Sequence, residues 1–70
     1  MLKNLLKVER ARKNITQAEL ANLVSVSRQT INAIELGKYV PSTVLSLKIA
    51  HTFEKSVNEV FELEDSDWLK

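Results

Sequence analysis

Four helix-start signals divide the chain into short helices and leave little length for a sheet. The segments 16–19 (TQAE) and 56–59 (SVNE) have the form of capping boxes, in which a hydroxyl and a carboxylate satisfy each other's backbone amides. Ser27 and Ser42 suit the N-cap position for the same chemical reason. The chain lacks a long alternation of apolar and polar residues, the pattern typical of strands. We therefore predict an all-α fold.

The expected helices follow this punctuation. The first runs from Leu2 to about Lys13 and stops at Asn14, and the third ends at Gly37, where the only glycine suits a left-handed residue. The residues expected to face inward are Leu20, Leu23 and Val24, then Ile31 and Ile34, then Leu45, Ile49 and Phe53, and finally Val57, Val60 and Phe61. The last stretch, 62–70, either frays or contributes a strand at 61–64 against residues 1–3.

Length and composition exclude several classes of protein. The 70 residues make one domain, expected at 1–63, with an acidic tail at 64–70. The chain has no cysteine and one histidine, so we expect no disulfide and no metal site. A glycine-rich phosphate loop cannot be built from one glycine, and we expect neither catalysis, nor a cofactor, nor a small-molecule ligand. We expect a soluble, cytoplasmic protein, because the N-terminus lacks a signal peptide and no apolar run could span a bilayer.

Charge is distributed unevenly along the chain. Residues 1–41 carry seven basic and three acidic side chains, whereas residues 42–70 carry three basic and six acidic ones. A protein with a basic front and an acidic back can present one face to a polyanion. Scattered, solvated charge explains the same counts equally well, so charge alone does not identify a partner.

Two short helical patterns are joined by only about three residues between 17 and 37, which describes a helix-turn-helix. Ala21 is the small residue that close helix packing requires, and Val26 is the apolar residue of the turn. The outer face of the second helix carries Ser27, Arg28, Gln29 and Asn32. Arginine can donate two hydrogen bonds to guanine, and glutamine or asparagine can pair with adenine. The alternative is an ordinary helical hairpin with a solvated face.

The spaced segments together resemble one family. They are Arg10, ITQAELA at 15–21, VSRQTI at 26–31, IELGK at 34–38, Pro41-Ser42, LKIA at 47–50 and VNEVF at 57–61. These motifs are similar to those of Cro/C1-type (lambda-repressor-like, XRE family) helix-turn-helix DNA-binding proteins, most of all to the short stand-alone homodimeric repressors. The resemblance implies a compact five-helix domain that binds double-stranded DNA and regulates transcription.

The resemblance also implies roles at matching positions. Base contacts are implied for Arg28, Gln29 and Asn32, and contacts to the DNA backbone for Gln17, Ser27, Lys38 and Tyr39. Arg10 and Glu35 match an ion pair that ties the first helix to the end of the third; the alternative is two unrelated surface charges. The chain departs from the family at Ser25, where glycine is common and where a positive φ would be strained, and at Ala33, which can offer a base only a methyl group.

A second copy is expected because one recognition helix reads only a few base pairs, and specific affinity usually needs two placed about 34 Å apart. The residues expected at this dimer interface are Val57, Val60, Phe61, Leu63 and Trp68. The alternative is that they fold back onto their own subunit. A different function, an antitoxin or protein-interaction module on the same scaffold, also remains open, since such a protein would bind its partner through the tail.

Overall fold

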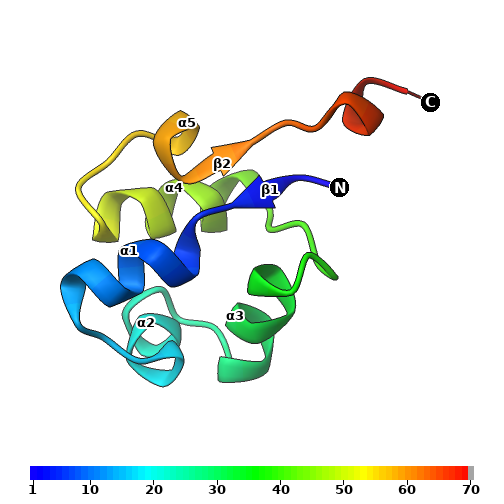
Figure 1. Ribbon diagram of the computed structural model, residues 1–70. Coiled ribbons are helices and arrows are strands. Elements are labelled where there is room, and N and C mark those ends of the chain that lie inside the picture. Colours follow the sequence, from blue (N-terminus) through cyan, green and yellow to red (C-terminus); the bar gives the residue numbers. More distant parts are fainter. Residues whose placement is uncertain (70) are drawn as a thin grey trace.

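The computed structural model describes residues 1–69, which form five α-helices, a two-stranded sheet and one turn of 3₁₀ helix (Figure 1). The elements in chain order are β1 (Lys3–Asn4), α1 (Leu6–Lys13), α2 (Gln17–Leu23), α3 (Arg28–Glu35), α4 (Thr43–Thr52), α5 (Val57–Val60), β2 (Phe61–Glu62) and η1 (Asp65–Trp68). This is the mostly helical fold that the sequence predicts. Lys70, the last residue of the expected acidic tail, lies outside the described residues. Within residues 1–69, no helix is long and apolar enough to cross a membrane.

The predicted caps account for where the middle helices begin. Thr16 Oγ1 accepts a hydrogen bond from the Glu19 amide at 3.0 Å, and the Glu19 carboxylate accepts one from the Thr16 amide at 2.9 Å. Ser27 Oγ and Ser42 Oγ each accept from the amide three residues later, at 3.2 and 3.1 Å. Each cap satisfies a backbone donor that the first helical turn leaves without a partner, which fixes the start of the helix.

The first helix begins later than predicted, at Leu6 and not at Leu2. Asn4 accounts for the difference, because its Oδ1 accepts from the Leu6 amide at 3.2 Å while its Nδ2 donates to the Ile34 carbonyl at 2.8 Å. The Leu5 amide donates to the Val60 carbonyl at 2.8 Å. Asn4 and Leu5 are therefore held by contacts with distant parts of the chain, so the helix cannot begin before Leu6.

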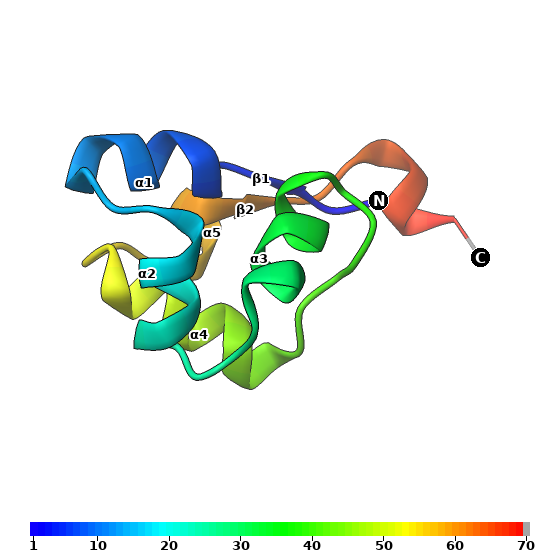
Figure 2. The ribbon, with the colours of Figure 1, turned by 90° about the horizontal axis from the view of Figure 1, so that it is seen from below.

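The two ends of the domain meet in a short antiparallel sheet, one of the two alternatives for the last stretch. Lys3 pairs with Glu62, and Asn4 pairs with Phe61. Both views show β1 and β2 side by side, with η1 extending beyond them near the N-terminus (Figures 1 and 2). The α-amino group of Met1 donates to Glu64 Oε1 at 2.9 Å, which holds the start of the tail beside the N-terminus.

The core contains nearly all of the residues expected to face inward. Its members are Leu6, Leu20, Ala21, Val24, Ile31, Ile34, Leu45, Ile49, Ala50, Phe53, Val60 and Phe61. The prediction for Leu23 is wrong: its side chain is 61% exposed, and Ala21 takes the inward position. On a helix with 3.6 residues per turn, residue 23 lies on the side of the buried Leu20 that faces away from the buried Ala21, which turns Leu23 toward solvent. Glu9 is buried in α1, where its carboxylate accepts from Arg12 Nη1 at 3.4 Å.

Candidate nucleic-acid interface

The turn between α2 and α3 sets the position of the candidate reading helix. Ser25 adopts a φ of +62°, the left-handed conformation that the sequence predicts at this non-glycine position. The Val26 amide donates to the Ala21 carbonyl at 3.0 Å, and the Val26 side chain packs against the core. Ala21 is buried, so α3 can approach α2 closely. The turn thus directs α3 across the end of α2, as a helix-turn-helix requires.

The outer face of α3 is polar and rich in hydrogen-bond donors. Arg28 and Gln29 are exposed and Asn32 is half-buried, whereas Ile31 and Ile34 on the opposite face are fully buried. The apolar residues therefore anchor α3 to the core and leave its N-terminal polar residues facing outward. This is the placement that an α-helix needs in order to reach base edges in a major groove.

Gln17, the first residue of α2, connects this face to α2. Its Nε2 donates to Asn32 Oδ1 and to Glu35 Oε1, both at 3.1 Å. Its Oε1 accepts from Arg28 Nη1 at 3.3 Å. Three side chains of α3 are therefore joined through one amide of α2, and the polar face is partly ordered before any ligand binds.

Arg10 and Glu35 form an ion pair beside these hydrogen bonds, since Glu35 also accepts from Gln17. Arg10 Nε lies 2.6 Å from Glu35 Oε2, and Arg10 Nη2 lies 3.0 Å from Glu35 Oε1. A third bond runs from Arg10 Nη1 to the Ile15 carbonyl at 3.2 Å. The hydrogen bond to Glu35 raises the pKa of the Arg10 guanidinium above its ordinary value. The pair is not two unrelated surface charges, because its side chains are only 15% and 7% exposed.

Comparison with known proteins agrees with this geometry. A family model described as helix-turn-helix matches residues 6–60, most of the chain. The chain belongs to the helix-turn-helix family. Its match is to the XRE branch of that family, as its motifs predict.

Several helix-turn-helix relatives are similar over nearly their whole length. An uncharacterized HTH-type transcriptional regulator of Methanocaldococcus jannaschii is 50% identical over 66 residues, covering 94% of this chain and all of the relative. Another from Bacillus subtilis is 46% identical with the same coverage. A third, from Archaeoglobus fulgidus, is 44% identical over 62 residues, which are 87% of each chain.

The residues expected at the DNA backbone lie on both sides of α3 in this helix-turn-helix domain. Ser27 is exposed, and its Oγ lies 3.0 Å from Thr30 Oγ1 at the start of the helix. Lys38 and Tyr39 are exposed just after the helix, where Gly37 has a φ of +74° and the Lys38 amide donates to the Ala33 carbonyl at 2.9 Å. These three side chains, together with Gln17 at the start of α2, therefore lie around the polar face of α3.

The residues expected at a dimer interface differ in exposure. Val60 and Phe61 are 1% and 6% exposed, because they fill the core of their own domain. Val57 is half-buried against the core. Leu63 and Trp68 are 55% and 75% exposed and could contact a partner.

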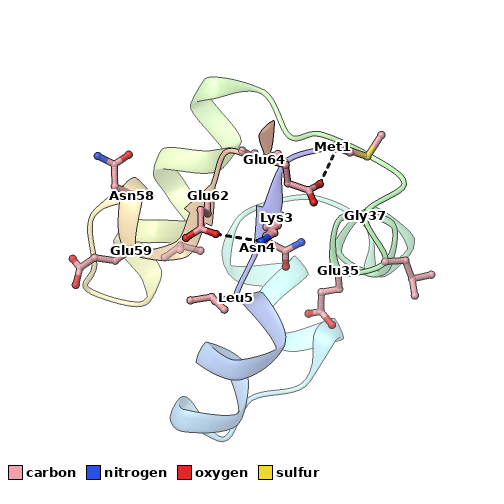
Figure 3. Close-up of a pocket in the computed structure, with 13 residues that line it drawn as sticks. Met1, Lys3, Asn4, Leu5, Glu35, Gly37, Asn58, Glu59, Glu62 and Glu64 are labelled. Carbon is pink, nitrogen blue, oxygen red and sulfur yellow. Dashed lines mark hydrogen bonds and ion pairs between the residues drawn. The ribbon is translucent and has the colours of Figure 1, made fainter. Parts of the chain in front are cut away.

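Sequence reasoning missed two features of this helix-turn-helix domain. The first is the bond from Gln17 to Glu35; the spacing of Arg28, Asn32 and Glu35 at i, i+4 and i+7 could have indicated that they share one face beside α2. The second is a groove of about 400 Å³ between β1, α5 and the end of α3 (Figure 3). The apolar residues that line it are Met1, Leu2, Leu5, Leu36 and Val60, and Glu35, Glu59, Glu62 and Glu64 supply its acidic groups.

Proposed function

We propose that this protein is a sequence-specific transcriptional regulator that acts as a repressor in the cytoplasm. It binds double-stranded DNA with α3 in the major groove and blocks transcription by occupying an operator. The observation that carries the proposal is the exposed, donor-rich face of α3, whose side chains are tied to Gln17 and supported by the buried Arg10–Glu35 pair. Membership of the helix-turn-helix family supports the same function.

Each group on the face suits one kind of contact. Arg28 has the planar pair of donors that fits guanine N7 and O6, and the exposed Gln29 amide suits adenine. Lys38 and Tyr39 follow α3 and suit phosphates next to the groove. We expect Ser27 to contact the backbone at the groove entrance. Base contacts would then supply specificity, while phosphate contacts would supply affinity that falls with salt.

We further propose that the protein binds an inverted repeat as a homodimer. The candidate interface consists of the exposed apolar side chains near the two ends of the chain, among them Leu63, Trp68 and Leu69. The groove beside the end of α3 adds further exposed apolar residues, among them Leu5 and Leu36. Burying this surface against a second copy would remove apolar area from water, and tryptophan is favoured at interfaces.

Selection from a random duplex pool tests the function directly. We expect enrichment of an inverted repeat whose half-sites lie about 10 base pairs apart, the spacing of one helical turn. A reporter placed behind the selected site should lose expression when the protein is produced. A lack of enrichment, with only weak and steeply salt-dependent binding, would refute sequence-specific regulation. The exposed Trp68 and Leu69 would then favour the alternative of a protein-interaction module or antitoxin.

Two alanine variants separate base reading from phosphate contact. Arg28→Ala should cost about 1–3 kcal/mol on the selected site and relax the preference at one base position. Lys38→Ala should weaken binding to all sequences alike and lower the salt slope by about one. Equal losses on every sequence for Arg28→Ala would contradict its role at a base.

The oligomeric state is tested by sedimentation of the wild type and of Leu63→Glu, which places a charge on the exposed part of the candidate interface. We expect a dimer that the substitution converts to a monomer with unchanged helix content. A wild type that stays monomeric at concentrations well above those at which it binds the operator would refute the homodimer.

A further inference from the structure

The orientation of the Gln17 amide is determined by two neighbours whose hydrogen-bond chemistry is unambiguous. Glu35 carries a carboxylate, which can only accept, so the Gln17 atom 3.1 Å from Glu35 Oε1 must be the donor nitrogen. Arg28 carries a guanidinium, which can only donate, so the Gln17 atom 3.3 Å from Arg28 Nη1 must be the oxygen. Both neighbours require the same orientation, and Arg10 holds Glu35 in place with two hydrogen bonds.

The orientation of Gln17 in turn determines that of Asn32. Gln17 Nε2 has two hydrogens, one for Glu35 Oε1 and one for the Asn32 atom that lies 3.1 Å away. That Asn32 atom must therefore be the acceptor Oδ1, because a second amino group there would place two donors in contact. The Nδ2 group of Asn32 is left on the other side of its amide, away from Gln17. Both hydrogens of Gln17 Nε2 are used within the free protein, so its side chain acts here as a positioning residue and not as the DNA-backbone contact that the resemblance implies.

We propose that Gln17 makes Asn32 a reader of hydrogen-bond acceptors, which restricts the base that this position prefers. The inference rests on the proposed function, since it requires Asn32 to face a base. Asparagine pairs with adenine by accepting from N6 through its oxygen and donating to N7 through its nitrogen. In this protein the oxygen is directed at Gln17, so the group presented to the groove is the Nδ2 donor.

The base edges then divide by the acceptors that they offer. In the major groove guanine has two acceptors, N7 and O6, and thymine has O4, whereas adenine has the N7 acceptor beside the N6 donor and cytosine has only the N4 donor. A donor-only Asn32 is therefore matched best by guanine, cannot accept from adenine N6 in the two-bond pair, and has no partner on cytosine. At the base pair that Asn32 contacts, guanine on the read strand should bind best and cytosine worst.

The experiment starts from the selected operator and measures affinity for all four base pairs at every position of a half-site. The position read by Asn32 is the one whose preference disappears in Asn32→Ala. We expect the wild type to bind the pair with guanine on the read strand about tenfold more tightly than the pair with cytosine there, equal to about 1.4 kcal/mol. Gln17→Met, which keeps the length of the side chain but cannot hydrogen-bond, should reduce this ratio to less than about threefold. Asn22→Met, which replaces an exposed amide of the same helix, should leave it at about tenfold.

Several results would overturn the inference. One is a single favoured pair with adenine or cytosine on the read strand, and another is a Gln17→Met protein that keeps the full preference for guanine over cytosine. Asn32→Ala that changes no position would show that Asn32 does not read a base. A wild type without any selective site would refute the proposed function, and the inference with it.

A measurement on the free protein tests the fixed orientation of the Gln17 amide separately from DNA binding. In the DNA-free state, the side-chain amide hydrogens of Gln17 should exchange with solvent several-fold more slowly than those of the exposed Gln29, as seen by NMR. Glu35→Gln should reduce the protection at Gln17. Equal exchange at Gln17 and Gln29 in the wild type would refute the fixed amide orientation, even if the protein binds DNA selectively.

Discussion

Replacement of Arg10 by methionine should destabilise the fold by about 3 kcal/mol. The substitution keeps most of the aliphatic volume but removes three hydrogen bonds, two to Glu35 and one to the Ile15 carbonyl. Glu35 would remain with only 7% of its side chain exposed and without its opposite charge. Removing one partner of a buried ion pair costs about 3–5 kcal/mol, mainly because the other charge is left without compensation. The lower end applies because Gln17 Nε2 still donates to Glu35 Oε1.

This loss is large for a domain of this size. One kcal/mol shifts the melting temperature of a 60–100-residue domain by roughly 4–8 °C, so we expect a decrease of about 12–24 °C. Urea unfolding followed by far-UV circular dichroism gives the free energy directly. The protein concentration should be the same for all variants, because dimerisation would make the apparent stability depend on it.

A matched control is the exposed ion pair between Lys13 and Glu54, whose Nζ–Oε1 distance of 2.7 Å is nearly the same. Lys13→Met should change stability little, because solvent screens exposed pairs. The double variant Arg10→Met/Glu35→Met should be more stable than Arg10→Met alone, since it removes the unpaired carboxylate. The reasoning would be refuted if Arg10→Met lowered the free energy of unfolding no more than Lys13→Met did. It would also be refuted if the double variant were no more stable than Arg10→Met.

Three further variants test local features. Ser25→Gly should raise the free energy of unfolding by about 0.5–1 kcal/mol, because glycine adopts the φ of +62° without strain; an unchanged urea midpoint would contradict this. Gly37→Ala should lower it by about 1 kcal/mol from backbone strain alone, since no atom lies within 4 Å of the added Cβ; thermal melts would show a larger loss if a clash contributed. Hydrogen bonds from Ser56 lower the pKa of Glu59 below its ordinary 4.5. The stabilisation from the ionised Glu59 carboxylate is therefore fully present above pH 4.5, and it is lost as the pH falls through the pKa of Glu59 in the folded state. Glu59→Gln should therefore flatten the acid side of the stability profile, and parallel profiles for the two proteins would show that Glu59 contributes nothing.

Local chemistry made the order of elements predictable from the sequence. Thr16, Ser27 and Ser42 begin helices because each oxygen caps an amide only three residues away, and Gly37 ends one because it tolerates a positive φ. These interactions depend on neighbouring residues alone. The left-handed conformation of Ser25 was instead predictable from the family resemblance, because glycine is common at this position of the turn.

The remaining details depend on contacts between residues far apart in the chain. Asn4 stops α1 because it bonds to the backbone of Ile34, which no local pattern reveals. Val60 and Phe61 have the same apolar character whether they fill the core or an interface, and only the packing of α5 decides between them. For the candidate site, the polar residues of α3 could be named from the sequence, but the amide of Gln17 that links them could not, because the link crosses from α2 to α3.

The pairing of β1 with β2 has a consequence for the order in which the domain folds. Lys3 and Glu62 lie near opposite ends of the chain, so their pairing closes almost the longest loop available, whereas α2 and α3 are neighbours in sequence. Since the entropy cost of loop closure grows with loop length, the α2–α3 unit should form first and the sheet last. In native-state hydrogen exchange, the sheet should correspondingly open before the helices. The bond from Asn4 to the Ile34 carbonyl directly joins this late-forming sheet to α3.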